Sequence, residues 1–117
     1  MSNILDIPLS LQQSAGNAQL ARELLEMLLT ELPDLREKLE TAIVERDMLS
    51  TWDYAHKIYG STAYCGVPAL REVAKVLEAA VKEGNLPKIE AQFEDLTYEI
   101  DRLLEEGQLA LDKDWIN

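Results

Sequence analysis

The stretch at residues 54–78, YAHKIYGSTAYCGVPALREVAKVLE, decides the fold of this chain. Small and apolar side chains in it and just before it fall on one arc when placed at 100° per residue: Met48, Thr51, Ala55, Ile58, Thr62 and Cys65. The arc predicts a helix over residues 48–64 with one face toward a core. The chain then turns at residues 65–67, where Gly66 is free to take a positive φ and Pro68 suits the first position of a second helix.

His56, the only histidine of the chain, lies well off that arc. Its neighbours one helical turn away are Trp52 and Asp53 on one side and Tyr59 and Gly60 on the other. A glycine inside a helix costs about 1 kcal/mol relative to alanine, which indicates that the space beside it is used. His56 is therefore either a surface residue without a special task or a reactive group that needs this space.

The spacing of residues after His56 resembles the signature of histidine phosphotransfer (HPt) domains. Ala55 precedes the histidine, and the matching positions follow it by four, ten, fourteen, twenty-one and twenty-two residues: Gly60, Gly66, Leu70, Leu77 and Glu78. The run YCGVP at residues 64–68 is most similar to the HPt domains at the C-terminal end of BarA/GacS-type hybrid sensor kinases. The resemblance covers nearly the whole chain.

This resemblance implies a phosphorelay function. His56 would accept a phosphoryl group from an aspartate of a receiver domain and pass it to an aspartate of a response regulator. Gly60 would leave room for the group, and Mg²⁺ would be held by the receiver, so that this chain binds no cofactor. The commonest family pattern has lysine three residues after the histidine, where this chain has Tyr59. Lys57, which points about 100° away from His56, could replace that lysine only in part.

Four side chains near His56 are further candidates at this site. Glu78 matches a family position that reaches the imidazole, where a hydrogen bond to Nδ1–H would leave Nε2 free to attack; an exposed glutamate without that role is the alternative. Trp52, Tyr59 and Ala63 are candidates for contact with a partner, because exposed aromatic residues bury much area at a small entropic cost. The alternative is that Trp52 and Tyr59 cover a groove of the bundle.

The flanking segments predict further helices. Residues 3–14 read as a segment with a short helix that has Pro8 in its first turn, and Asn17 suits the N-cap of a long arm over residues 18–45. Pro33 interrupts this arm, and a restart at residues 32–34 is favoured over a bend. Asp47 can cap the histidine helix.

The remaining residues that end helices predict the architecture. Gly84 and Asn85 end the second helix of the central stretch, and a last helix covers residues 86–106 and stops at Gly107. Four long antiparallel arms with short connections predict an all-α, up-and-down four-helix bundle with a short N-terminal helix. A single domain then comprises an N-terminal segment (1–16), the bundle (17–107) and a final turn or frayed tail (108–117).

The composition of the chain excludes several classes of function. The 117 residues carry 22 acidic and 11 basic side chains, and the net charge of −11 argues against nucleic-acid binding and direct contact with anionic membranes. No apolar run has the length of a membrane span. With one histidine and with Cys65 as the only cysteine, neither a metal site nor an intrachain disulfide is expected. We expect a cytoplasmic monomer, either free-standing or the C-terminal domain of an inner-membrane sensor kinase.

Two other classes of function compete with phosphotransfer. A helical adaptor that binds a receiver without chemistry is compatible with Tyr59 at the usual lysine position. An independent enzyme is disfavoured, because the chain has no Ser-His-Asp arrangement, phosphate loop or HExxH motif. A phosphoryl carrier without catalysis of its own is the preferred interpretation.

Overall fold

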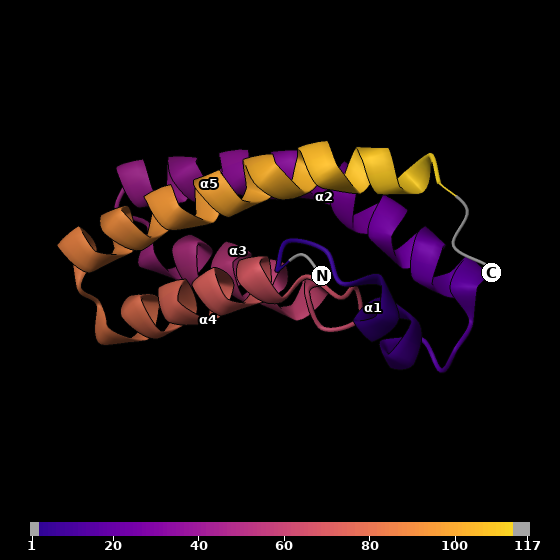
Figure 1. Ribbon diagram of the computed structural model, residues 1–117. Coiled ribbons are helices and arrows are strands. Elements are labelled where there is room, and N and C mark those ends of the chain that lie inside the picture. Colours follow the sequence, from indigo (N-terminus) through magenta and orange to yellow (C-terminus); the bar gives the residue numbers. More distant parts are fainter. Residues whose placement is uncertain (1–2, 114–117) are drawn as a thin grey trace.

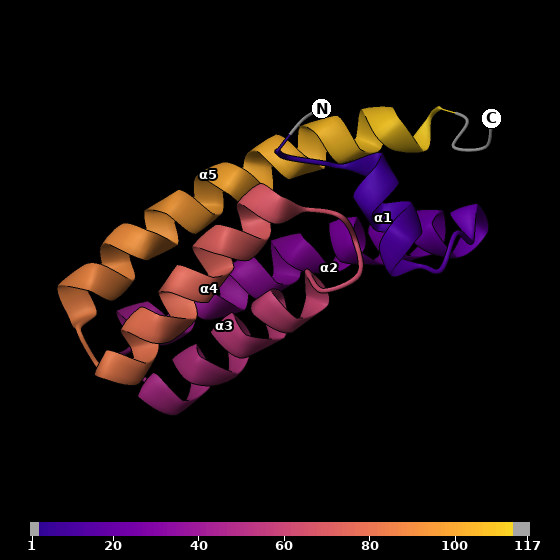
Figure 2. The same ribbon diagram turned by 60° about the horizontal axis from the view of Figure 1, so that its bottom comes forward.

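The computed structural model describes residues 3–113, which form five helices and no strand (Figure 1). The helices are α1 (Ile7–Gln13), α2 (Ala18–Val44), α3 (Met48–Ser61), α4 (Pro68–Glu83) and α5 (Leu86–Leu111). The four long helices form a closed ring in which α2 contacts α3 and α5, and α4 contacts the same two helices. Figure 2 shows α1 lying across one end of this bundle. The predicted all-α bundle with a short N-terminal helix is confirmed.

Side-chain caps fix where α2 and α3 begin. Asn17 Oδ1 accepts a hydrogen bond from the backbone N–H of Leu20 at 3.0 Å, and Asp47 Oδ1 accepts one from Ser50 N–H at 3.1 Å, as predicted. The Asp47 carboxylate also accepts from the Ser50 hydroxyl, and these bonds lower the pKa of Asp47. Because the first N–H groups of a helix have no partner inside it, each cap determines the residue at which its helix starts.

Pro33 does not divide α2, so the predicted restart at residues 32–34 is wrong. The proline ring is exposed, whereas the neighbouring Leu32 is completely buried, as are Leu25 and Leu39 two turns away on either side. A proline removes one backbone hydrogen bond. Burial of these leucines on both sides of it offsets that loss, because packing of the apolar face supplies most of the stability of a helix in a protein.

The helix ends also differ from those predicted. α3 ends at Ser61 and not at residue 64, while α5 continues through Gly107 to Leu111. Gly107 is a packing position: a Cβ there would lie 2.9 Å from the Leu29 methyl groups of α2. Arg22 of α2 donates a hydrogen bond to the Leu111 carbonyl, which stabilises the end of α5. Of the predicted tail, residues 108–111 are helical, and residues 114–117 lie outside the described part of the chain.

The predicted core arc of α3 is buried with one exception. Thr51, Ala55 and Ile58 are at most 1% exposed, and Thr62 and Cys65 beyond the helix are also buried. Met48 is 38% exposed, because it is the first residue of α3 and lies at the end of the bundle. The arc nevertheless orients the helix, so the opposite side of α3 faces solvent.

Gly66 holds the turn between α3 and α4 against the N-terminal segment. Its φ is +63°, as predicted, its carbonyl accepts a hydrogen bond from Asp6 N–H at 2.8 Å, and its own N–H donates to Gln13 Oε1 at 2.9 Å. A Cβ at this position would lie 2.4 Å from the Asp6 carbonyl oxygen and 2.7 Å from Ser10 N. Backbone atoms surround the position, so no side chain fits there.

We predict that Gly66→Ala lowers the free energy of unfolding by about 2–4 kcal/mol, because it adds a backbone clash to an unfavourable φ. Gly84→Ala is the matched control: Gly84 has φ +69°, but a Cβ there would meet nothing within 4 Å. This substitution should cost only about 1 kcal/mol. Urea unfolding followed by circular dichroism measures both values, and equal losses would refute the close approach at Gly66.

A second prediction concerns Cys65, whose burial and, secondarily, the charge of Glu31 raise the pKa of its thiol from 9.0 to about 11. Between pH 9 and 11 the unfolded chain loses this proton while the folded chain keeps it. Stability should therefore decrease as the pH rises through this range, by up to about 2–3 kcal/mol. Urea unfolding should show a shallower decrease for Cys65→Ala than for the wild type; parallel curves would contradict the prediction.

Candidate functional site

His56 projects from the solvent side of α3 toward α4. Its Nδ1 lies 3.1 Å from Oε2 of Glu78, a hydrogen-bond distance across the two helices. The two side chains differ in burial: that of His56 is 61% exposed and that of Glu78 is 13% exposed. A carboxylate accepts hydrogen bonds only, so this contact favours the tautomer with the proton on Nδ1. The lone pair of Nε2 is then free.

Trp52 stacks on the imidazole. The ring centroids of Trp52 and His56 are 5.3 Å apart and their planes differ by 17°. Trp52 is half-buried and packs against the hydrophobic core. Lys82 of α4 completes the group, with its Nζ 5.3 Å from the Trp52 ring and 3.9 Å from Oε1 of Glu78. Trp52 of α3 thus covers one face of the imidazole, and Glu78 of α4 holds its Nδ1 edge.

Tyr59 pairs with Arg71 of α4. The guanidinium lies 4.4 Å from the centre of the Tyr59 ring, and its Nη2 donates to the tyrosine hydroxyl at 3.2 Å. Its Nη1 donates to the hydroxyl of Thr62 at 3.0 Å. A cation therefore lies beside the residue that occupies the usual lysine position of the family pattern, one helical turn from His56.

Arg71 and Lys82 were not identified from the sequence, although a signal was present. Both lie on the α4 face that carries Glu78, seven residues before it and four residues after it. Glu78 was singled out, so a search for charged residues on the same face would have found them. The contacts with α3 could not be found in this way, because they depend on how the two helices are aligned.

The remaining residues that the sequence marks as candidates are Gly60, Lys57 and Ala63. Gly60 is exposed, and a Cβ there would meet nothing within 4 Å, so packing does not require the glycine and the space beside it is open. Lys57 turns to Tyr54, with its Nζ 5.5 Å from that ring, and the structure does not bring it to His56. Ala63 is half-buried just beyond the end of α3.

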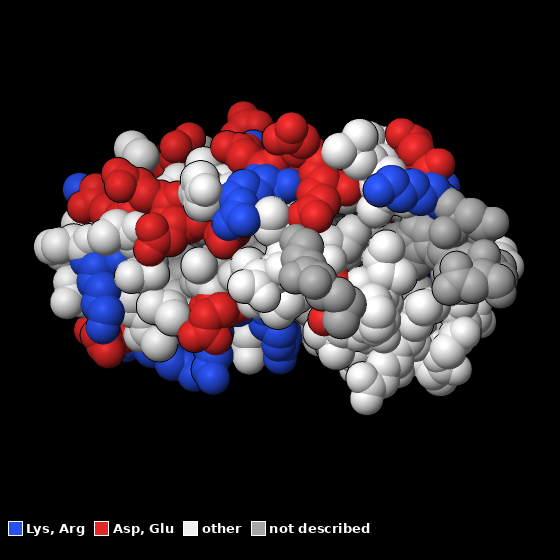
Figure 3. Space-filling model, viewed as in Figure 1, with Lys and Arg blue, Asp and Glu red and all other residues white. Residues whose placement is uncertain are grey.

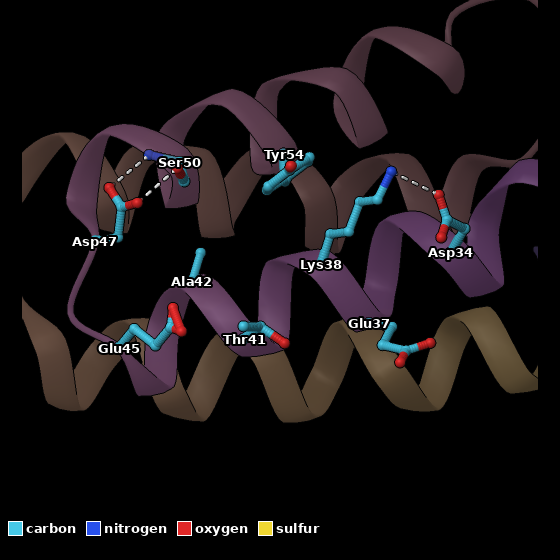
Figure 4. Close-up of a pocket in the computed structure, with 9 residues that line it drawn as sticks. All are labelled: Asp34, Glu37, Lys38, Thr41, Ala42, Glu45, Asp47, Ser50 and Tyr54. Carbon is cyan, nitrogen blue, oxygen red and sulfur yellow. Dashed lines mark hydrogen bonds and ion pairs between the residues drawn. The ribbon is translucent and has the colours of Figure 1, made fainter.

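His56 does not line the groove shown in Figure 4, which lies between α2 and the first half of α3. Tyr54 marks the α3 side of that groove, two residues and therefore about 200° from His56 on the helix. The imidazole instead stands on an outward ridge of α3. A reactive group in such a position is accessible to a group carried by another macromolecule.

Charge is distributed unequally over the bundle. Residues 48–83, which contain α3 and α4, carry four basic and four acidic side chains: Lys57, Arg71, Lys75, Lys82, Asp53, Glu72, Glu78 and Glu83. The net charge of −11 therefore belongs to the rest of the chain. Figure 3 shows acidic side chains gathered over α5 and basic ones along the edge formed by α4. A negatively charged group meets less repulsion at the His56 side than elsewhere.

No helix within residues 3–113 is long and apolar enough to cross a membrane.

Comparison with known sequences relates the chain to signalling proteins. The Hpt domain family model matches residues 23–106. The histidine-protein kinase BarA of Escherichia coli K12 is 34% identical over 108 residues, and the sensor protein GacS of Pseudomonas syringae pv. syringae is 36% identical over 106 residues. These matches cover 92% and 91% of this chain but only 12% of each kinase. The chain thus spans about an eighth of the length of these curated relatives.

Two further comparisons extend the match. The phosphorelay intermediate protein rdeA of Dictyostelium discoideum is 27% identical over 90 residues, which are 77% of this chain and 35% of that protein. The crystal structure of the HPT domain from a hybrid histidine kinase of Shewanella superposes with a TM-score of 0.87 at 30% identity, covering 94% of this chain and 95% of that domain. The chain therefore belongs to the Hpt domain family, the histidine phosphotransfer carriers of two-component signalling.

Proposed function

We propose that this chain carries phosphoryl groups on Nε2 of His56. It accepts them from an aspartate of the receiver domain of a hybrid sensor kinase and passes them to an aspartate of a response regulator. Membership of the family supports the reaction class, and His56 is the only histidine in the chain. The observation that supports His56 as the acceptor is its exposed imidazole, with Nδ1 held 3.1 Å from the Glu78 carboxylate.

Each transfer exchanges one bond for another. The Nε2 lone pair attacks the phosphorus of the receiver's aspartyl phosphate, the Nε2–P bond forms, and the bond from phosphorus to the aspartate oxygen breaks. The proton on Nδ1 stays in place, so the product ring is positively charged. Glu78 stabilises that charge through the hydrogen bond it already makes. The second transfer reverses these steps with the aspartate of the next receiver.

The remaining residues support the phosphoryl group or the partner. Gly60 leaves open space one turn from His56, and Tyr59 lies at the border of the site. Because Lys57 is turned toward Tyr54, its contribution to the site in this arrangement is its charge and not a contact. Trp52 and Ala63 contact the docked receiver at the edges of the site.

The partner receiver supplies the remaining chemistry. Phosphoryl transfer depends on in-line placement and on neutralising the equatorial oxygens, tasks that Mg²⁺ and a lysine of the receiver perform. The chain itself then needs no cofactor and no catalysis of its own, and it acts as a monomer in the cytoplasm. It works either as a free carrier or as the last domain of a hybrid sensor kinase, whose kinase activity belongs to other domains.

The test of this function is transfer of label from a phosphorylated receiver domain to the protein, run beside His56→Gln. The wild type should acquire label that is acid-labile and base-stable, as expected for phosphohistidine, and the variant should acquire none. Both proteins should show the same helical circular dichroism, because His56 is exposed and its replacement removes no core contact.

Two results would contradict the proposal. Label on His56→Gln would place the acceptor elsewhere. Receiver binding without label on the wild type, for several receivers, would favour an adaptor that only binds the receiver. In that case Tyr59→Lys, which restores the usual family residue, tests whether the missing lysine is the cause.

A further prediction isolates Glu78. Replacing it with alanine removes a hydrogen bond to a charged ring, and should slow phosphotransfer by about 10- to 100-fold. The ¹⁵N shifts of the imidazole should show a smaller fraction of the Nδ1–H tautomer. Glu72→Ala, which removes an exposed glutamate from the same helix, is the control and should change neither quantity. An unchanged rate for Glu78→Ala would remove Glu78 from the site.

A further inference from the structure

We propose that Trp52 is a positioning residue that fixes the plane of the His56 imidazole. Together with Glu78 it holds the ring in the orientation that presents Nε2 to an incoming phosphoryl group. This inference rests on the proposed role of His56 and adds a second restraint to the one that Glu78 provides.

One hydrogen bond does not fix an imidazole. The last torsion of a histidine side chain has broad minima, so the ring can turn while Nδ1 keeps its contact with Glu78. Stacking supplies the missing restraint, because the Trp52 and His56 planes differ by only 17° at a centroid distance of 5.3 Å. The Nδ1 contact fixes the direction of one ring edge, and the stack fixes the plane.

Trp52 is itself held in place. It lies one turn before His56 on α3, and a helical side chain leans over the turn before it, so His56 leans toward Trp52. The indole is half-buried against the core, which limits its own motion. Lys82 lies 5.3 Å from the indole ring and 3.9 Å from Oε1 of Glu78, so the same cation contacts both groups that restrain the imidazole.

The plane of the ring matters for the reaction. The Nε2 lone pair lies in the plane of the imidazole, and transfer requires that it point along the line of the bond that breaks. A ring free to rotate satisfies this condition for only part of the time. The stacked ring also shields one imidazole face, which leaves the exposed edge as the direction of approach.

A positioning role and a docking role for Trp52 predict different changes in transfer from a phosphorylated receiver. The rate constant at saturating receiver reports transfer within the complex, and the receiver concentration that gives half of that rate reports docking. If Trp52 orients the imidazole, its loss lowers the rate constant at saturation, where the donor is held in place. If Trp52 only contacts the partner, its loss raises the half-saturating concentration and leaves the rate constant at saturation unchanged.

The experiment compares Trp52→Leu, which loses the stack, with Trp52→Phe, which retains an aromatic ring. We expect Trp52→Leu to lower the rate constant at saturating receiver by roughly three- to tenfold, and Trp52→Phe to stay within about twofold of wild type. Tyr98→Leu is the matched control, because Tyr98 is an exposed aromatic residue on α5. It should react like the wild type.

A second measurement leaves Trp52 unchanged, so it does not depend on how the Trp52 variants fold. Trp115→Phe makes Trp52 the only tryptophan. Phosphorylation of His56 by phosphoramidate should then change the fluorescence of Trp52, and the change should vanish when His56→Gln is added. Constant fluorescence during confirmed phosphorylation would overturn the stack.

Two rate patterns would also overturn the positioning role. In one, Trp52→Leu raises the half-saturating receiver concentration but has a normal rate constant at saturation; in the other, it changes neither quantity. Neither pattern affects the proposed function, which fails if a phosphorylated receiver does not label the wild-type protein or if it labels His56→Gln. The two proposals therefore fail on different observations.

Discussion

The arrangement of the site depends on the turn at Gly66, where the chain passes so close to the N-terminal segment that no side chain fits. Asp6 N–H donates a hydrogen bond to the Gly66 carbonyl, which ties that segment to the turn. Ala69 N–H donates to the Asn3 carbonyl, which ties it to the start of α4. The turn joins α3 to α4 in an antiparallel register in which Trp52 meets Lys82 and His56 meets Glu78. A shift of either helix by one turn, about 5.4 Å, would separate the imidazole from its carboxylate.

Within that register, the site combines a fixed carboxylate with an accessible nucleophile. Glu78 is largely covered by its surroundings and His56 is largely exposed, so the bundle restrains the imidazole without enclosing it. Under the proposed function this suits a carrier that meets two receiver domains in turn, because the surface of the partner and not a pocket would complete the reaction site. The charges of α3 and α4 balance, whereas the rest of the chain carries the net negative charge. A negatively charged group is therefore repelled less at the His56 side than elsewhere on the surface.

Local sequence rules succeeded where the deciding interaction is local, and failed where distant residues decide. The caps at Asn17 and Asp47 and the positive φ of Gly66 depend on a few neighbouring residues, and all were predicted. The sequence predicts a restart at Pro33 and a helix end at Gly107, yet both residues lie inside continuous helices. In each case packing keeps the helix continuous despite a residue that disfavours it. Buried leucines lie on both sides of Pro33, and Leu29 of another helix packs against Gly107.

The sequence by itself determined the helical class, the order of the helices, the exposed side of α3 and the choice of His56 and Glu78 as candidates. These follow from periodicity, from turn and cap residues, and from the spacing shared with a known family. Only the tertiary structure decided that Trp52 stacks on the imidazole, that Arg71 pairs with Tyr59, and that Lys57 points elsewhere. The physical reason is that such contacts depend on helix register and side-chain rotamers. Packing of the whole bundle fixes both, and the pattern along one helix does not contain them.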